Sequence, residues 1–241
     1  MTEETALSKP IKMGINRKGI AANKQNFDNT MRDIDPLKVP NRLGLVIDDS
    51  GSMGREGMEK AHDAVRAFCQ NCNPQDTSIA VYPLNAEKRP LICNYDAVTG
   101  YVNGVWATGG TPIYGTLDML LSDSGITRAI LFSDGSPTDG SCLKQDGYSI
   151  WREPGNWKDR VEKVFKSYNA KEVPIDTIFI GIKDSDGYKE MEEIAKRTGG
   201  TFLHFTDASV LAKSLKYLAP KFRALLANPE IKERIQRGES I

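Results

Sequence analysis

This sequence contains few histidines and cysteines, has no net charge and lacks long apolar segments. Only 2 histidines and 4 cysteines occur among its 241 residues. So few cysteines exclude a disulfide-stapled scaffold and favour a reduced, cytoplasmic protein. Lys and Arg together number 32, and so do Asp and Glu, which leaves a net charge of zero. A balanced charge argues against nucleic-acid binding through the overall field of the protein.

Membrane and export signals are missing as well. No apolar run approaches the roughly 18 residues that a membrane-spanning helix needs. The first residues, MTEET, carry neither a basic region nor an apolar one, so nothing is typical of a secretory signal. We therefore expect no membrane association and a cytoplasmic location.

The remaining composition divides the chain into three parts. Residues 1–41 are polar and rich in Asn and Lys, which predicts a partly extended N-terminal arm. Residues 42–218 alternate between short apolar runs and segments with helical spacing. Residues 219–241 are expected to form a helical tail, with Asn228 as the N-cap of its helix.

The middle part predicts an α/β domain. Its strands are apolar on both faces and alternate with helices, which is typical of a mostly parallel sheet covered by helices. Pro90 places its strand at an edge of the sheet. The expected strands are 43–47, 77–84, 88–95, 129–132, 175–182 and 202–205, and the expected helices are 58–69, 113–121, 158–168, 188–198 and 208–218.

Three polar, glycine-containing loops border these elements, namely 48–54 (DDSGSMG), 109–112 (GGTP) and 133–137 (SDGSP). Ligands of open α/β sheets lie at the carboxyl ends of the strands, where two of these loops begin. Asp48, Ser50 and Ser52 alternate in one tight loop, so their oxygens can converge, and Thr111 and Asp134 add a hydroxyl and a carboxylate. Oxygen ligands suit Mg²⁺ or Mn²⁺ and disfavour Zn²⁺. Because few of these ligands are charged, they do not fully balance the positive charge of the ion. The ion is then expected to bind a further carboxylate from another molecule.

These motifs resemble those of the von Willebrand factor A domain with a metal-ion-dependent adhesion site. The Asp-x-Ser-x-Ser motif matches Asp48, Ser50 and Ser52, the second-loop threonine matches Thr111, and the third-loop aspartate matches Asp134. The resemblance covers roughly residues 42–218. It implies a Rossmann-like, doubly wound sheet and Mg²⁺ at these five residues, with Mn²⁺ or Ca²⁺ as alternatives. It also implies binding of a partner whose Asp or Glu completes the metal shell.

The resemblance further implies the type of partner. Intracellular members of the family often serve as adaptors in multiprotein assemblies, frequently beside AAA+ ATPases, so we expect an adaptor rather than an enzyme. Aromatic and basic side chains near the loops are expected to contact the partner, as such residues often dominate interfaces. The candidates are Trp106, Tyr148, Trp151 and Arg152.

Three alternatives stay open. The loop residues could be ordinary turns, with Ser50 or Ser52 capping the helix that follows. The site could belong to a metal-dependent phosphoesterase, although no His or Lys base is evident in the motifs and no P-loop occurs. The chain could also be a structural protein that assembles through its arm and tail, with a homo-oligomer as one form of assembly.

Overall fold

The computed structural model describes residues 34–70, 72–123, 125–143 and 157–205. The chain divides by its contacts into two units, Met1–Asp33 and Ile34–Ile241. All elements below belong to the second unit. The expected helix over 208–218, the tail and the arm up to residue 33 lie outside the described residues.

A six-stranded sheet forms the centre of this unit, in the order β3-β2-β1-β4-β5-β6. All neighbouring strands are parallel except β3, which runs antiparallel to β2 at the edge. The mostly parallel sheet and the edge position of the strand that contains Pro90 are thereby confirmed. The strands are β1 Asn41–Ile47, β2 Thr77–Pro83, β3 Arg89–Ile92, β4 Arg128–Ser133, β5 Ile175–Ile180 and β6 Phe202–Phe205.

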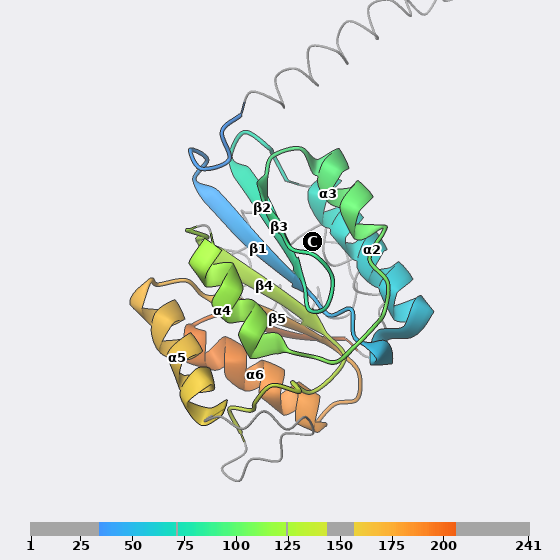
Figure 1. Cartoon of the computed structure of the whole chain (residues 1–241), viewed down its shortest axis with the longest axis vertical. Coiled ribbons are helices and arrows are strands. Elements are labelled where there is room, and N and C mark those ends of the chain that lie inside the picture. Colours follow the sequence, from blue (N-terminus) through green and yellow to red (C-terminus); the bar gives the residue numbers. More distant parts are fainter. Residues whose placement is uncertain (1–33, 71, 124, 144–156, 206–241) are drawn as a thin grey trace, which may run out of the picture. The chain divides into compact units, whose positions relative to one another are not determined.

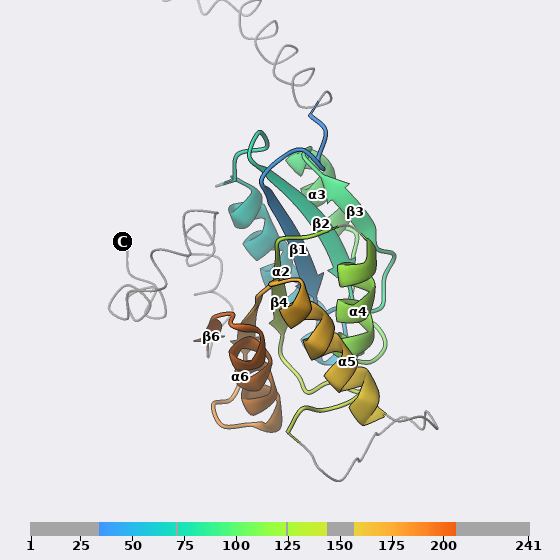
Figure 2. The same cartoon turned by 90° about the vertical axis from the view of Figure 1, so that its left-hand side faces the viewer.

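Helices cover both faces of the sheet (Figures 1 and 2). One face carries α2 Gly54–Gln70 and α3 Tyr95–Val102. The other face carries α4 Ile113–Asp123, α5 Trp157–Ala170 and α6 Asp186–Thr198. A single 3-10 turn, η1 Gly51–Met53, precedes α2. Within the described ranges, no helix combines the length and the apolar character needed to cross a lipid bilayer.

The core explains why β1 carries no polar side chain from residue 43 to residue 47. Leu45 and Ile47 point into the cluster formed with α2 and α3, whereas Val46 between them points into the cluster formed with α4, α5 and α6. All three side chains are fully buried. A strand with both faces covered cannot show the apolar–polar alternation of a half-exposed strand.

One helix differs from the expectation. Residues up to 95 were expected to extend the edge strand, but β3 ends at Ile92 and α3 begins at Tyr95. The Asn94 side chain caps this helix by accepting from the Ala97 N–H at 3.2 Å. Thr99 and Gly100 have low helix propensity, so α3 forms through its cap and through the burial of its apolar face.

The topology fixes where a ligand site can lie. The chain moves outward from β1 to β2 and β3, and then returns to the other side of β1 to form β4, β5 and β6. Ligands of such sheets bind at the carboxyl ends of the strands where the order reverses. In the β1–β4 ladder Ile47 is paired with Phe132, so the loops that follow these two strands begin side by side.

Candidate metal site

The first loop turns sharply because the Asp48 carboxylate holds it. Asp48 is fully buried directly after β1. Its Oδ1 accepts the Ser50 N–H at 2.9 Å, and its Oδ2 accepts the hydroxyl of Ser133 at the end of β4. Asp48 therefore joins the first loop to the third loop and still has a lone pair on each oxygen.

Three further oxygens lie next to one another beside Asp48. The Ser50 and Ser52 Oγ atoms are 3.0 Å apart, and Ser52 Oγ donates to Asp134 Oδ1 at 2.8 Å. Ser50 is buried, Ser52 is exposed and Asp134 is half-buried, so the group opens to solvent on one side.

Capping of η1 does not account for the Ser50 hydroxyl. Ser50 occupies the N-cap position of η1, but its side chain makes no capping hydrogen bond there. The Oγ of Ser50 is instead directed toward Ser52. Ser50 is therefore not a side-chain cap of η1.

The second loop brings Thr111 to the same place. The Thr111 N–H donates to Thr138 Oγ1 at 3.0 Å, and the Thr138 N–H donates to the Thr111 carbonyl at 2.9 Å. A Cβ atom placed on Gly135 would lie 3.8 Å from Ser52 Oγ and 3.9 Å from Thr111 Oγ1. The hydroxyls of the first and second loops thus border the same small space beside the third loop.

The candidate site contains two acidic side chains, Asp48 and Asp134, whose negative charge is not balanced by a basic side chain in the described ranges. Burial raises the pKa of Asp48, and the charge of Asp134 raises it further, while hydrogen bonds from Ser133 and Ser50 oppose the rise. Burial likewise raises the pKa of Asp134, against the hydrogen bond from Ser52. Within the described ranges, neither carboxylate forms an ion pair with Lys, Arg or His. A cation would supply the missing positive charge.

The donor set fits a hard divalent cation. Adjacent ligands of an octahedral ion at about 2.1 Å lie about 3.0 Å from each other. The separations Ser50–Ser52 and Ser52–Asp134, 3.0 and 2.8 Å, match that spacing. In the described part of the chain no group of three His, Cys, Asp or Glu side chains could hold a metal, so the fit rests on the hydroxyls as much as on the carboxylates.

The third loop is held by an acid that sequence reasoning did not single out. Asp139 accepts the Tyr114 N–H at 3.3 Å and the Gly115 N–H at 2.6 Å, and thus caps the start of α4 from another segment. These contacts tie the third loop to the helix that follows the second loop. The sequence offered one sign of this role, which is that Asp139 follows Asp134 by only five residues.

A second buried acid fixes the next part of this loop. Glu190 on α6 accepts hydrogen bonds from the Tyr114 hydroxyl, the Ser141 hydroxyl and the Cys142 N–H, at 2.5, 2.7 and 2.6 Å. The side chain is only 2% exposed. Glu190 therefore connects α4, α6 and the segment that leads away from the candidate site.

The expected partner surface is described only at Trp106. Its side chain is 52% exposed and packs edge-on against the His62 ring at 5.6 Å. The other three candidates, Tyr148, Trp151 and Arg152, lie outside the described residues.

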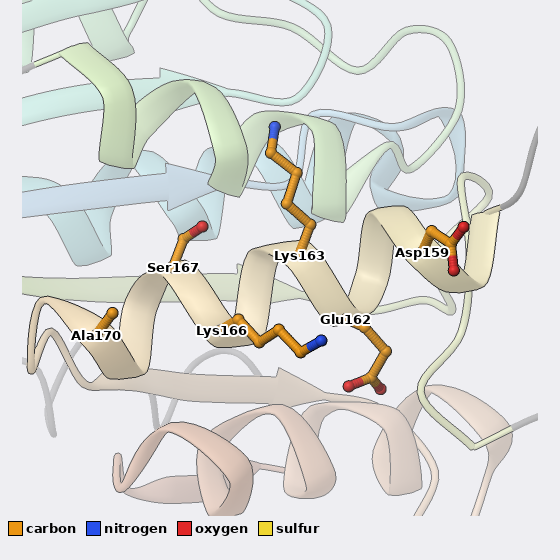
Figure 3. Close-up of a pocket in the computed structure, with 6 residues that line it drawn as sticks. All are labelled: Asp159, Glu162, Lys163, Lys166, Ser167 and Ala170. Carbon is orange, nitrogen blue, oxygen red and sulfur yellow. The ribbon is translucent and has the colours of Figure 1, made fainter.

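A surface depression on α5 is a poor alternative site. Figure 3 shows its lining, in which Lys163 reaches toward α4 while Lys166 and Glu162 extend along the opposite side of the helix. Lys163 Nζ is paired with Asp118 at 2.9 Å, and Glu162 is paired with Arg197 at 2.8 Å. All of its lining residues come from this one helix, so no second wall is available to enclose a ligand.

Comparisons with known proteins reveal structures of similar fold but low sequence identity. No protein-family model and no curated protein matches the chain. A von Willebrand factor type A structure from Catenulispora acidiphila is similar, with a TM-score of 0.57 and 19% identity, over 75% of this chain and 42% of that one. The vWF domain of the type V pili tip protein Mfa5 from Porphyromonas gingivalis is similar with a TM-score of 0.53 and 16% identity, over 84% of this chain and 98% of that one.

A pilus adhesin is also similar. SpaC from Lactobacillus rhamnosus GG has a TM-score of 0.55 and 15% identity, over 83% of this chain and 31% of the adhesin. The chain thus spans less than half the length of the Catenulispora protein and of SpaC. At this level of identity the likeness concerns architecture, and the chain has the Rossmann-like α/β fold of von Willebrand factor A domains.

Proposed function

We propose that this protein is a metal-dependent protein-binding module. Mg²⁺, with Mn²⁺ or Ca²⁺ as substitutes, is held by Asp48, Ser50, Ser52, Thr111 and Asp134. The observation that carries the proposal is the spacing of the Ser50, Ser52 and Asp134 oxygens at 2.8–3.0 Å, which suits neighbouring ligands of one small cation.

The ligand chemistry suggests the kind of partner. Asp48 and Asp134 are the two carboxylates among the five ligands, and the other three are neutral hydroxyls. Asp48 is buried, while Ser52 is exposed to solvent, so a bound cation would be accessible from the Ser52 side. An Asp or Glu side chain of a partner would complete its coordination on that side. Trp106, half-exposed near the second loop, would add an apolar contact.

The biological setting proposed here is an adaptor within a cytoplasmic assembly, with an AAA+ ATPase complex as one candidate partner. SpaC is named an adhesin, which is a binding function, and this agrees with a binding module rather than an enzyme. The motif residues contribute carboxylates and hydroxyls but no His or Lys that could serve as a general base.

Thermal unfolding with Mg²⁺ or with EDTA tests the proposal. Mg²⁺ should raise the melting temperature of the wild type and should leave Asp134→Ala unchanged. Asp63→Ala is the matched control, because Asp63 lies on the exposed side of α2 and, among the residues that the structure describes, pairs with Arg66 alone. It should respond to Mg²⁺ as the wild type does. An equal response of Asp134→Ala and the wild type would contradict the proposed site.

The enzyme alternative has its own test. Mg²⁺-dependent hydrolysis of p-nitrophenyl phosphate by the wild type, lost in Asp134→Ala and kept in Asp63→Ala, would replace the binding module with a phosphoesterase. We expect no turnover from any of the three proteins.

A further inference from the structure

Asp49 stands between two proposed ligands but faces away from them. Its Oδ1 accepts the Asn85 N–H at 2.8 Å, and its Oδ2 accepts the Ala86 N–H at 3.0 Å. The Asn85 side-chain amide donates to the same Oδ1 at 3.1 Å. Asp49 is fully buried and forms no ion pair within the described ranges. These three N–H groups are therefore the hydrogen-bond donors to its carboxylate there.

Asn85 extends this contact to the second loop. Its Nδ2 also donates to the Gly110 carbonyl at 2.9 Å, directly before Thr111. Gly109 makes the approach possible, because a Cβ atom there would lie 2.5 Å from Asn85 Oδ1. Gly109 also has a φ of +68°, a conformation that glycine adopts most readily.

Backbone hydrogen bonds join the first and second loops on the same side. The Thr108 N–H donates to the Asp49 carbonyl at 2.6 Å, and the Gly51 N–H donates to the Gly109 carbonyl at 3.1 Å. Asp49 and Asn85 therefore complete a set of contacts that spans the segment after β1, the segment after β2 and the Gly109–Gly110 pair. Two adjacent glycines give that segment much conformational freedom when nothing holds it.

We propose that Asp49 and Asn85 together form a clamp that positions Thr111 for metal binding. This inference rests on the proposed function. The clamp does not contact the cation, since both Asp49 oxygens are directed to Asn85 and Ala86. It acts by fixing the Gly110 carbonyl, and hence the start of Thr111, relative to the loop that carries Ser50 and Ser52. Groups that orient metal ligands in this way commonly change metal affinity by 10- to 100-fold when they are replaced.

A double-mutant cycle on Mn²⁺ affinity, measured by electron paramagnetic resonance titration, tests the clamp. Asn85→Ala and Thr111→Ala should each weaken Mn²⁺ binding by about tenfold or more. The double variant should be no weaker than Thr111→Ala alone, because the clamp has no further effect once the Thr111 hydroxyl is gone. Additive losses would overturn the proposal, and so would an unchanged affinity of Asn85→Ala.

Two measurements separate positioning from folding. Unfolding in EDTA reports the stability of each metal-free variant, and only variants that unfold cooperatively enter the cycle. Asn85→Ser is the second variant at this position. Its hydroxyl is one atom shorter than the amide and cannot bridge Asp49 and the Gly110 carbonyl. The hydrogen bond from the backbone N–H of residue 85 to Asp49 is kept in this variant. Asn85→Ser should reproduce the loss of affinity. Wild type that fails to bind Mn²⁺ would overturn the proposed function and the clamp together, whereas tight binding by wild type and Asn85→Ser alike would overturn the clamp alone.

Discussion

The Ser52 hydroxyl donates to Asp134 Oδ1 at 2.8 Å, across 82 positions of sequence. This contact joins the loop after β1 to the loop after β4, which are neighbours because β1 and β4 pair in parallel. Ser52 thus supplies a hydrogen bond to a carboxylate that we propose as a metal ligand. A hydroxyl oxygen keeps its lone pairs while it donates, so at the proposed site Ser52 would face the ion with a lone pair.

Ser52→Ala should weaken Mg²⁺ binding by about tenfold, close to 1.4 kcal/mol, while the free energy of unfolding in EDTA changes by less than about 0.5 kcal/mol. The side chain is exposed, so its removal leaves no cavity. Isothermal titration calorimetry measures the affinity. Ser136→Ala is the control, since Ser136 is an exposed serine on the third loop outside the proposed ligand set, and it should bind Mg²⁺ as the wild type does.

The loss of stability with rising pH should become smaller when Mg²⁺ is added. Burial raises the pKa of Asp48, Asp134 and Asp139 above that of the unfolded chain. These groups stabilise the metal-free fold at pH values below the unfolded pKa, and that contribution is lost as the pH rises through their folded pKa values. Saturating Mg²⁺ favours the ionised forms of Asp48 and Asp134, so it should offset this loss.

Melting temperatures between pH 4 and pH 7, with EDTA and with Mg²⁺, check this offset. Asp48→Asn in EDTA should show a smaller fall across this range than the wild type. Parallel profiles with and without Mg²⁺ would contradict a cation at these carboxylates.

Glu190→Ala should destabilise the protein by about 3 kcal/mol, because it removes three hydrogen bonds to a buried carboxylate, from the Tyr114 hydroxyl, the Ser141 hydroxyl and the Cys142 N–H. Urea unfolding gives the change. Glu192→Ala, an exposed position on the same helix, should stay within about 0.5 kcal/mol of the wild type. Similar losses in the two variants would mean that the buried hydrogen bonds contribute little.

Two glycine-to-alanine substitutions should act in opposite directions. A Cβ atom at Gly187, in the first turn of α6, would lie 2.9 Å from the Gly135 carbonyl carbon and oxygen, so Gly187→Ala must displace the third loop. We expect lower stability and weaker Mg²⁺ binding. Gly100 in α3 has open space around it, and Gly100→Ala should stabilise the protein by about 0.5–1 kcal/mol without changing the affinity.

Chemical denaturation and Mg²⁺ titration of this pair provide the comparison. Normal Mg²⁺ affinity in a folded Gly187→Ala protein would contradict the view that contact with α6 sets the position of Asp134.

The sequence predicted most of the fold because its local signals agree with its packing. The expected strand 202–205 coincides with β6, and the expected helix 188–198 ends where α6 ends, before Gly199, a left-handed C-cap with a φ of +69°. Helix α3 was missed because its low-propensity residues form a helix only when Tyr95, Val98 and Val102 are buried against the sheet. Its cap, Asn94, was the one local signal available.

The candidate ligands could be named from the sequence, whereas the residues that support them could not. The alternation of Asp48, Ser50 and Ser52 is visible in a single segment, whereas the partner of Asp49 lies on another strand end at Asn85. Only the three-dimensional arrangement shows that Asp49 faces away from its two neighbours. Glu190 could have been suspected, as an acidic residue within the apolar stripe that also contains Met191 and Ile194, but nothing in the sequence names its three donors.

The most direct test of the metal site is a crystal structure of the protein grown with Mn²⁺, with the ion located by anomalous diffraction. We predict one strong peak about 2.2 Å from the Oγ atoms of Ser50 and Ser52, adjacent to Thr111 and Asp134. An anomalous map without a peak among these residues at saturating Mn²⁺, or with its main peak elsewhere on the chain, would contradict the account.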